Sequence, residues 1–116
     1  LAEAVKGVDA ILFVLPTKVI RLVAKQLNGL LENKPMIIHA SKGLEQETFK
    51  RISEILAEEL DRDSYEDIVV LSGPSHAEEV ARRDITTITA ACENLRSMCK
   101  HSSVIPSSVF IRIRTV

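Results

Sequence analysis

Runs of hydrophobic residues alternate with amphipathic segments along most of this chain. Nearly continuous apolar runs at residues 9–15, 36–40 and 68–71 predict strands that are buried on both faces, as in a parallel sheet. Between them, residues 17–31 and 46–60 carry apolar side chains at helical spacing, which predicts two amphipathic helices. The alternation of strands and helices predicts an α/β fold with a mainly parallel sheet.

The same patterns predict shorter elements elsewhere in the chain. A short helix is expected to end at residues 5–7, with Gly7 in the position that stops it. The remaining predictions are helices at 75–83 and 93–100, a polar loop at 61–66, and strands at 85–90 and 109–113.

Three turns follow the predicted strands, and in α/β sheets ligands bind at the carboxyl ends of the strands. The turns are Leu-Pro-Thr at residues 15–17, Ser-Lys-Gly at 41–43 and Ser-Gly-Pro-Ser at 72–75. They line one crevice if their strands are parallel neighbours. Ser75 and Glu78 have the spacing of a capping box, and the N-terminus of the helix they open favours an anion such as phosphate. The alternative is that both residues only cap that helix.

Individual residues in these turns leave several roles open. Lys42 could hold a phosphate as a point charge, could act as an acid if partial burial lowered its pKa, or could be an ordinary solvated lysine. Pro16 and Thr17 offer a wall for a cofactor ring or ribose, or simply a strand stop and a helix cap. His39 fits a satisfied histidine of the core or of a strand end better than a catalytic one.

Composition narrows the class of protein only slightly. With 116 residues and a net charge of -1, the chain has no basic footprint that argues for nucleic acid. No apolar run has the length of a membrane span, and Cys92 and Cys99 fit no metal-binding spacing. Two reduced thiols indicate a cytoplasmic protein. The chain begins with Leu-Ala-Glu-Ala and no signal peptide, so we expect it to be part of a longer protein.

Three segments occur together in the order and spacing of one family. Residues 8–17, 40–45 and 71–80 resemble the bacterial NAD(P)-dependent glycerol-3-phosphate dehydrogenases, and the match runs from residue 1 to about residue 94. The resemblance implies interconversion of sn-glycerol 3-phosphate and dihydroxyacetone phosphate with NAD or NADP. It also implies a Rossmann-type, doubly wound domain that lacks its first strands, followed in the family by a helical domain.

The resemblance further implies roles for individual residues. The residue that matches Lys42 contacts both substrate and cofactor in the family. Gly73 and Ser75 match substrate contacts, and Ala77 matches a cofactor contact; we add Pro16 as a cofactor wall. The chain has four glycines but no G-x-G-x-x-G turn, and nothing in it matches the catalytic lysine of the helical domain. We therefore expect the 116-residue chain to be inactive alone.

The end of the chain departs from the family pattern. Residues 1–95 are predicted to be the second half of the NAD(P)-binding domain, and residues 96–116 its end, with atypical sequence. One hypothesis is a frameshift, because a shifted reading from Ser97 gives a His-Val-Gln-Ala-Leu-Phe peptide typical of the family. The coding DNA tests this hypothesis directly.

Other functions remain as alternatives at this point. One is a Rossmann-type dehydrogenase of the 6-phosphogluconate or 3-hydroxyacyl type. The Ser-Lys-Gly and Ser-Gly-Pro-Ser turns disfavour this alternative. Another is a non-catalytic module that binds phosphate or a nucleotide. A homodimer is an open alternative for the assembly, since an exposed sheet edge can pair with a second copy.

Overall fold

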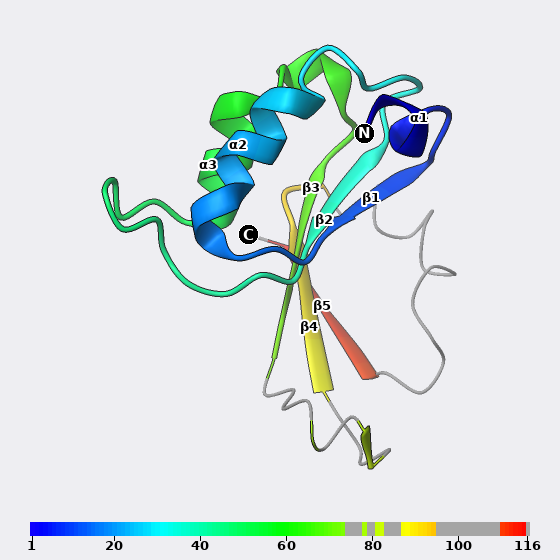
Figure 1. Ribbon diagram of the computed structural model, residues 1–116. Coiled ribbons are helices and arrows are strands. Elements are labelled where there is room, and N and C mark those ends of the chain that lie inside the picture. The colour runs from blue at the N-terminus through cyan, green and yellow to red at the C-terminus, as the bar shows by residue number, and fades with distance from the viewer. Residues whose placement is uncertain (74–77, 79–80, 83–86, 95–109, 116) are drawn as a thin grey trace.

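The computed structural model describes residues 1–73, 78, 81–82, 87–94 and 110–115 (Figure 1). For residue 87 and residues 110–115 it describes the backbone alone. Nine elements follow one another along these residues: α1 (Ala2–Val5), β1 (Ala10–Phe13), α2 (Thr17–Leu27), β2 (Met36–His39), α3 (Ile52–Glu59), the 3-10 turn η1 (Arg62–Ser64), β3 (Ile68–Ser72), β4 (Thr87–Cys92) and β5 (Phe110–Thr115). The alternation predicted from the sequence is confirmed for the first three strands.

The five strands form one sheet in the order β1-β2-β3-β4-β5. β1 pairs with β2, and β2 with β3, in parallel. β4 runs antiparallel to β3, and β5 runs parallel to β4. The prediction of a mainly parallel sheet is therefore correct, with one antiparallel pairing in its middle.

α2 begins where the sequence predicts but ends four residues earlier. Ile20, Ala24 and Leu27 recur at helical spacing and are almost fully buried, so they fix the face of the helix that packs on the sheet. At the next residue the backbone becomes extended, and Gly29 adopts a φ of +84°. Residues 28–31 therefore leave the helix, whereas the hydrophobic pattern alone predicts that they continue it.

The second predicted helix is wrong over its first six residues. Residues 46–51 form a tight loop, because the Glu45 N–H donates to the Lys50 carbonyl at 3.0 Å and Leu44 bridges to Arg51 in antiparallel fashion. Phe49 has a φ of +56° and is 75% exposed, so it is not part of an apolar stripe. α3 starts only at Ile52, after the Arg51 N–H donates to the Glu54 carboxylate at 2.8 Å.

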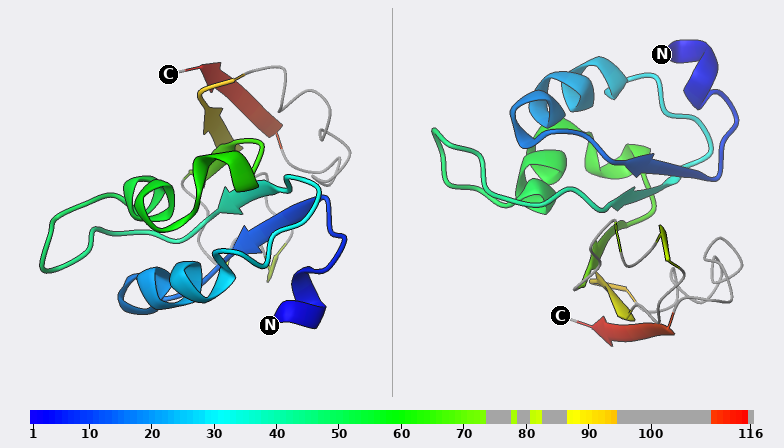
Figure 2. Two further views of the ribbon diagram at one scale, coloured as in Figure 1. Left: turned by 90° about the horizontal axis from the view of Figure 1, so that it is seen from above. Right: turned by 60° about the horizontal axis from the view of Figure 1, so that its bottom comes forward.

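The core lies mainly between β1–β3 and the two helices that cover one of their faces (Figures 1 and 2). α2 and α3 lie side by side there and contact each other. The buried residues of this core are Val5, Phe13, Ile20, Ala24, Leu27, Ile37, Ile52, Ile55, Leu56, Leu60 and Tyr65. α1 ends before Gly7, whose φ is +67°, as predicted.

The opposite face of the sheet carries a smaller cluster, formed by Met36, Ile38, Val69, Ala90 and Cys92. This cluster reaches β1 only at Ala10, because Leu12 is 57% exposed, and Val14 after the strand is 64% exposed. The prediction that residues 9–15 are buried on both faces is therefore wrong, because no described element covers the second face at Leu12 and Val14.

The predictions for the end of the chain are tested only in part. The strand predicted at 85–90 is β4, shifted by two residues, and the strand predicted at 109–113 is β5. Most of the helices predicted at 75–83 and 93–100 lies outside the described residues, although the Arg82 N–H donates to the Glu78 carbonyl as in a helical turn. Among the described residues, every helix is too short or too polar to cross a membrane.

Candidate functional site

Because β1, β2 and β3 are parallel neighbours, their carboxyl ends lie at one edge of the sheet. Hydrogen bonds link the first of the turns that follow them to the second, and the second to the third. The Leu15 N–H after β1 donates to Ser41 Oγ after β2 at 2.9 Å. Lys42 Nζ donates to the carbonyl of Gly73, after β3, at 3.5 Å. The predicted convergence of the three turns is therefore confirmed as far as Gly73.

Lys42 occupies the middle of this edge, and its side chain is exposed. An ammonium group has three N–H donors, so the bond to Gly73 leaves two of them available. An exposed cation at the carboxyl edge of parallel strands is suited to a phosphate or another anion. This geometry supports the point-charge role among the three roles that the sequence left open.

Thr17 does not cap α2, although the sequence predicts that it could. Pro16 stands at the N-cap position with a φ of -57°, and α2 has no side-chain cap. Thr17 is the first residue of the helix, and its hydroxyl donates to the Lys42 carbonyl at 2.9 Å. The hydroxyl proton is thus used to hold the Lys42 turn and is not available as a donor to a ribose.

Pro16 lines a groove of about 610 Å³ between the start of α2 and the loop after Gly43. The other lining residues are Thr17, Lys18, Arg21, Leu22, Lys25, Leu44, Glu45, Gln46 and Glu47. Lys42 and Gly73 do not line it. They are also absent from the lining of a groove of about 420 Å³ formed by α3, β3 and β4. Of the predicted site residues that the structure describes, Pro16 therefore lines a groove, whereas Lys42 and Gly73 lie at the open edge outside both grooves.

Two of the predicted site residues, Ser75 and Ala77, lie outside the described residues. Gly73 is the last residue of the third turn that the structure describes, and it is half-buried. The roles predicted for Ser75 and Ala77 stay predictions.

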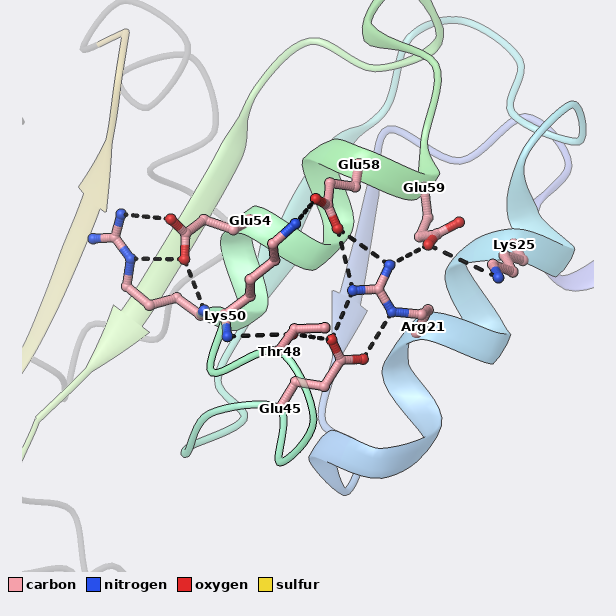
Figure 3. Close-up of polar contacts among 9 residues, drawn as sticks. Arg21, Lys25, Glu45, Thr48, Lys50, Glu54, Glu58 and Glu59 are labelled. Carbon is pink, nitrogen blue, oxygen red and sulfur yellow. Dashed lines mark hydrogen bonds and ion pairs between the residues drawn. The ribbon is translucent and has the colours of Figure 1, made fainter.

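An ion-pair cluster that the sequence does not predict lies beside the Lys42 turn (Figure 3). Arg21 of α2 makes a bidentate contact with Glu45, from Nε to Oε1 and from Nη2 to Oε2, each at 2.7 Å. The same guanidinium contacts Glu58 at 3.1 Å and also Glu59, both on α3. The periodicity of α2 places Arg21 on its polar face, but local sequence does not show which carboxylate it meets 24 residues later.

The cluster shifts the pKa values of its members. The hydrogen bonds from Arg21, and then that from Thr48, lower the pKa of Glu45 to about 2. The hydrogen bonds to Glu45 and Glu59 raise the pKa of Arg21. Both groups are therefore charged at any pH near neutrality, and the pair persists under the conditions of an enzyme assay.

His39 is the last residue of β2 and is only 4% exposed. Its position in the core at a strand end is as predicted. Neither ring nitrogen meets hydrogen-bond geometry with a partner among the described residues, so the expectation that it is satisfied is not met there, although the Ser41 backbone lies near enough to raise the pKa of the ring. Burial lowers the pKa of the imidazole from its usual value of 6.5, so the ring is neutral at pH 7.

The parallel strands β1–β3 are covered by α2 and α3 and carry Lys42 at their carboxyl edge. This arrangement defines an α/β domain of the doubly wound, Rossmann-type class. Among the described residues, no group of three or more histidine, cysteine or acidic side chains is placed to hold a metal ion. The chain belongs to the family described as NAD-dependent glycerol-3-phosphate dehydrogenase N-terminus, whose model matches residues 1–98.

Curated relatives agree with this family assignment. The chain is 60% identical to glycerol-3-phosphate dehydrogenase [NAD(P)+] of Ligilactobacillus salivarius, over 99% of this chain and 35% of the relative. It is 66% identical to the enzyme of the same name from Enterococcus faecalis, over 82% of this chain and 28% of that protein. The chain thus spans about a third of the length of the curated relatives it matches.

Solved structures support the fold. The structure of glycerol-3-phosphate dehydrogenase from Coxiella burnetii matches with a TM-score of 0.82 and 26% identity, covering 98% of this chain and 34% of that one. The Plasmodium falciparum structure has a TM-score of 0.78 at 20% identity, covers all of this chain and 32% of its own, and shows the shared fold alone. The family model and the curated relatives, and not these structures, favour the predicted family over the 6-phosphogluconate and 3-hydroxyacyl types.

Proposed function

We propose that this chain is the second half of the nucleotide-binding domain of an enzyme that interconverts sn-glycerol 3-phosphate and dihydroxyacetone phosphate with NAD or NADP. Membership of the family and the names of its relatives support the reaction. The observation that carries the site is the contact of 3.5 Å between Lys42 Nζ and the Gly73 carbonyl, which joins two turns at the carboxyl edge.

In this proposal Lys42 binds the substrate and the cofactor through its exposed ammonium group. Gly73, which has no side chain, lets a ligand approach the backbone closely, and Ser75 offers a hydroxyl to the substrate. Pro16 and Ala77 contact the cofactor. The nicotinamide supplies the hydride chemistry when it is bound, and the residues of this chain hold and orient the two reactants.

We further propose a cytoplasmic location, because a phosphorylated metabolite and a nicotinamide cofactor are both charged molecules that membranes retain. We expect the 116-residue chain to lack dehydrogenase activity by itself, since no residue in it matches the catalytic lysine of the family. A homodimer stays a prediction, and the molecular mass in solution tests it.

Replacing Lys42 tests the proposed site. In the full-length protein that carries this chain, Lys42→Ala should lower kcat/KM for glycerol 3-phosphate about ten- to a hundredfold, the usual value of a charge-assisted contact. Steady-state kinetics with NAD and with NADP measure the effect. The matched control is Lys6→Ala, because Lys6 is also exposed but precedes β1 and lies at the other end of that strand. Unchanged kinetics of Lys42→Ala would remove Lys42 from the site.

A further inference from the structure

The turn that carries Lys42 is attached to the rest of the molecule at three consecutive places. Before Lys42, the Ser41 hydroxyl accepts the Leu15 N–H at 2.9 Å. At Lys42 itself, the backbone carbonyl accepts the Thr17 hydroxyl at 2.9 Å. After it, the Glu45 carboxylate is held by Arg21. The turn is therefore tied on both sides of the lysine, to the residue after the end of β1 that Ser41 contacts and to α2.

These attachments matter because packing does not fix the Lys42 side chain, which is exposed. A flexible four-carbon stem reaches a defined point only if its backbone is held. The next residue, Gly43, has a φ of +104°, a conformation that side-chain-bearing residues rarely adopt. The turn is thus a special conformation whose stability depends on contacts from outside it.

The Arg21–Glu45 contact is suited to this task. It is bidentate, with both distances at 2.7 Å, and planar pairs of this kind fix orientation as well as separation. The two side chains are 25% and 16% exposed, so they are more shielded from water than the Lys50–Glu58 and Arg51–Glu54 pairs and about as shielded as the Arg21–Glu59 pair (Figure 3). Arg21 also contacts Glu59 and Glu58 of α3, but those contacts lead away from the Lys42 turn.

We infer that Thr17 and Glu45 are positioning residues for Lys42: the Thr17 hydroxyl holds the Lys42 carbonyl, and Glu45, bound to Arg21, holds the chain three residues later. The inference rests on the proposed function, because it assigns these contacts to the same substrate site. Neither residue needs to touch the substrate. Each acts by keeping the Lys42 ammonium within reach of the Gly73 carbonyl and of a bound phosphate.

The first test replaces Thr17 in the full-length protein. Thr17→Val keeps the shape of the side chain and removes the hydroxyl, and we expect KM for glycerol 3-phosphate to rise roughly three- to tenfold, as loss of one hydrogen bond predicts. Thr17→Ser restores the hydroxyl and should restore KM. In the Lys42→Ala background, Thr17→Val should have no further effect on KM, because the residue through which it acts is gone.

The second test uses the two carboxylates that share the Arg21 guanidinium. Glu45→Gln weakens the contact that leads to the Lys42 turn, whereas Glu59→Gln weakens the contact that leads to α3. Glu45→Gln should raise KM about as much as Thr17→Val does. Glu59→Gln is the matched control and should leave KM unchanged. Thermal unfolding of both variants shows whether each is folded in the assay.

The outcomes separate the inference from the proposed function. If Lys42→Ala impairs the enzyme while Thr17→Val and Glu45→Gln have normal KM values, the positioning role is overturned and the function stands. Equal effects of Glu45→Gln and Glu59→Gln also overturn it, because they indicate a general loss of structure. If Lys42→Ala has no effect, Lys42 is not part of the site and the inference fails with it; if the unaltered full-length protein does not turn over glycerol 3-phosphate, the proposed function itself fails.

Discussion

On the helix-covered face of the sheet, Ile37 and Leu56 have no exposed surface, whereas at the carboxyl edge Lys42 and Gly43 are exposed. The first region is held by the close packing of apolar side chains, which has no preferred direction. The second is held by a few directed contacts, such as that from Thr17 to the Lys42 carbonyl. Stability and the proposed ligand binding therefore depend on different residues of a small domain.

The largest effect expected from this difference is on the covered face. Leu56→Ala removes a fully buried side chain of α3 and should lower the free energy of unfolding by about 2–5 kcal/mol, through lost burial and the cavity left behind. Urea unfolding followed by circular dichroism measures it. The control is Leu22→Ala on α2, a leucine that is 58% exposed and should cost no more than about 0.5 kcal/mol. Similar losses in the two variants would contradict the comparison.

An intermediate effect on the free energy of unfolding is expected at Gly43, which has an unusual backbone conformation and lies at the carboxyl edge. Gly43→Ala forces a side chain into a φ of +104° and places its Cβ 3.4 Å from Thr17 Oγ1, so it strains the backbone and disturbs the contact with Lys42. We expect a loss of about 2 kcal/mol. Gly29→Ala is the control, since its φ is +84° but nothing lies within 4 Å of the added Cβ, and it should lose only about 1 kcal/mol. Equal losses would show that the contact with Thr17 is irrelevant.

The smallest effect concerns His39, which lies where the two regions meet. Burial lowers the pKa of its imidazole below 6.5, so as the pH falls through 6.5 the unfolded chain takes up a proton that the folded chain does not. The contribution of His39 to stability is thus complete above pH 6.5 and declines below it. His39→Phe should remove this part of the pH dependence, which unfolding at pH 7.5 and pH 5.5 measures. An unchanged slope in the variant would show that His39 is not the group responsible.

The sequence by itself predicts the β1–β3 framework and the edge at which we propose that ligands bind. The apolar runs locate three parallel strands, and the rule about their carboxyl ends selects Lys42 and Gly73 before any coordinates are known. Resemblance to the family supplies the reaction, which composition and periodicity do not contain. These features are predictable because burial of consecutive or periodic side chains is a local property of the chain.

Only the tertiary structure shows that Thr17 holds the Lys42 carbonyl, that Arg21 meets Glu45, and that the buried His39 ring lacks a partner with hydrogen-bond geometry among the described residues. The first two contacts join residues 25 and 24 positions apart, so they depend on how α2 packs beside the loop after β2. α3 also starts later than the hydrophobic pattern predicts. The hydrogen bond between Glu45 and Lys50 closes a loop there, and this loop outweighs a helical pattern that includes Phe49. Local sequence specifies which side chains are apolar and which are charged. The contacts that these side chains make depend on how the whole chain packs.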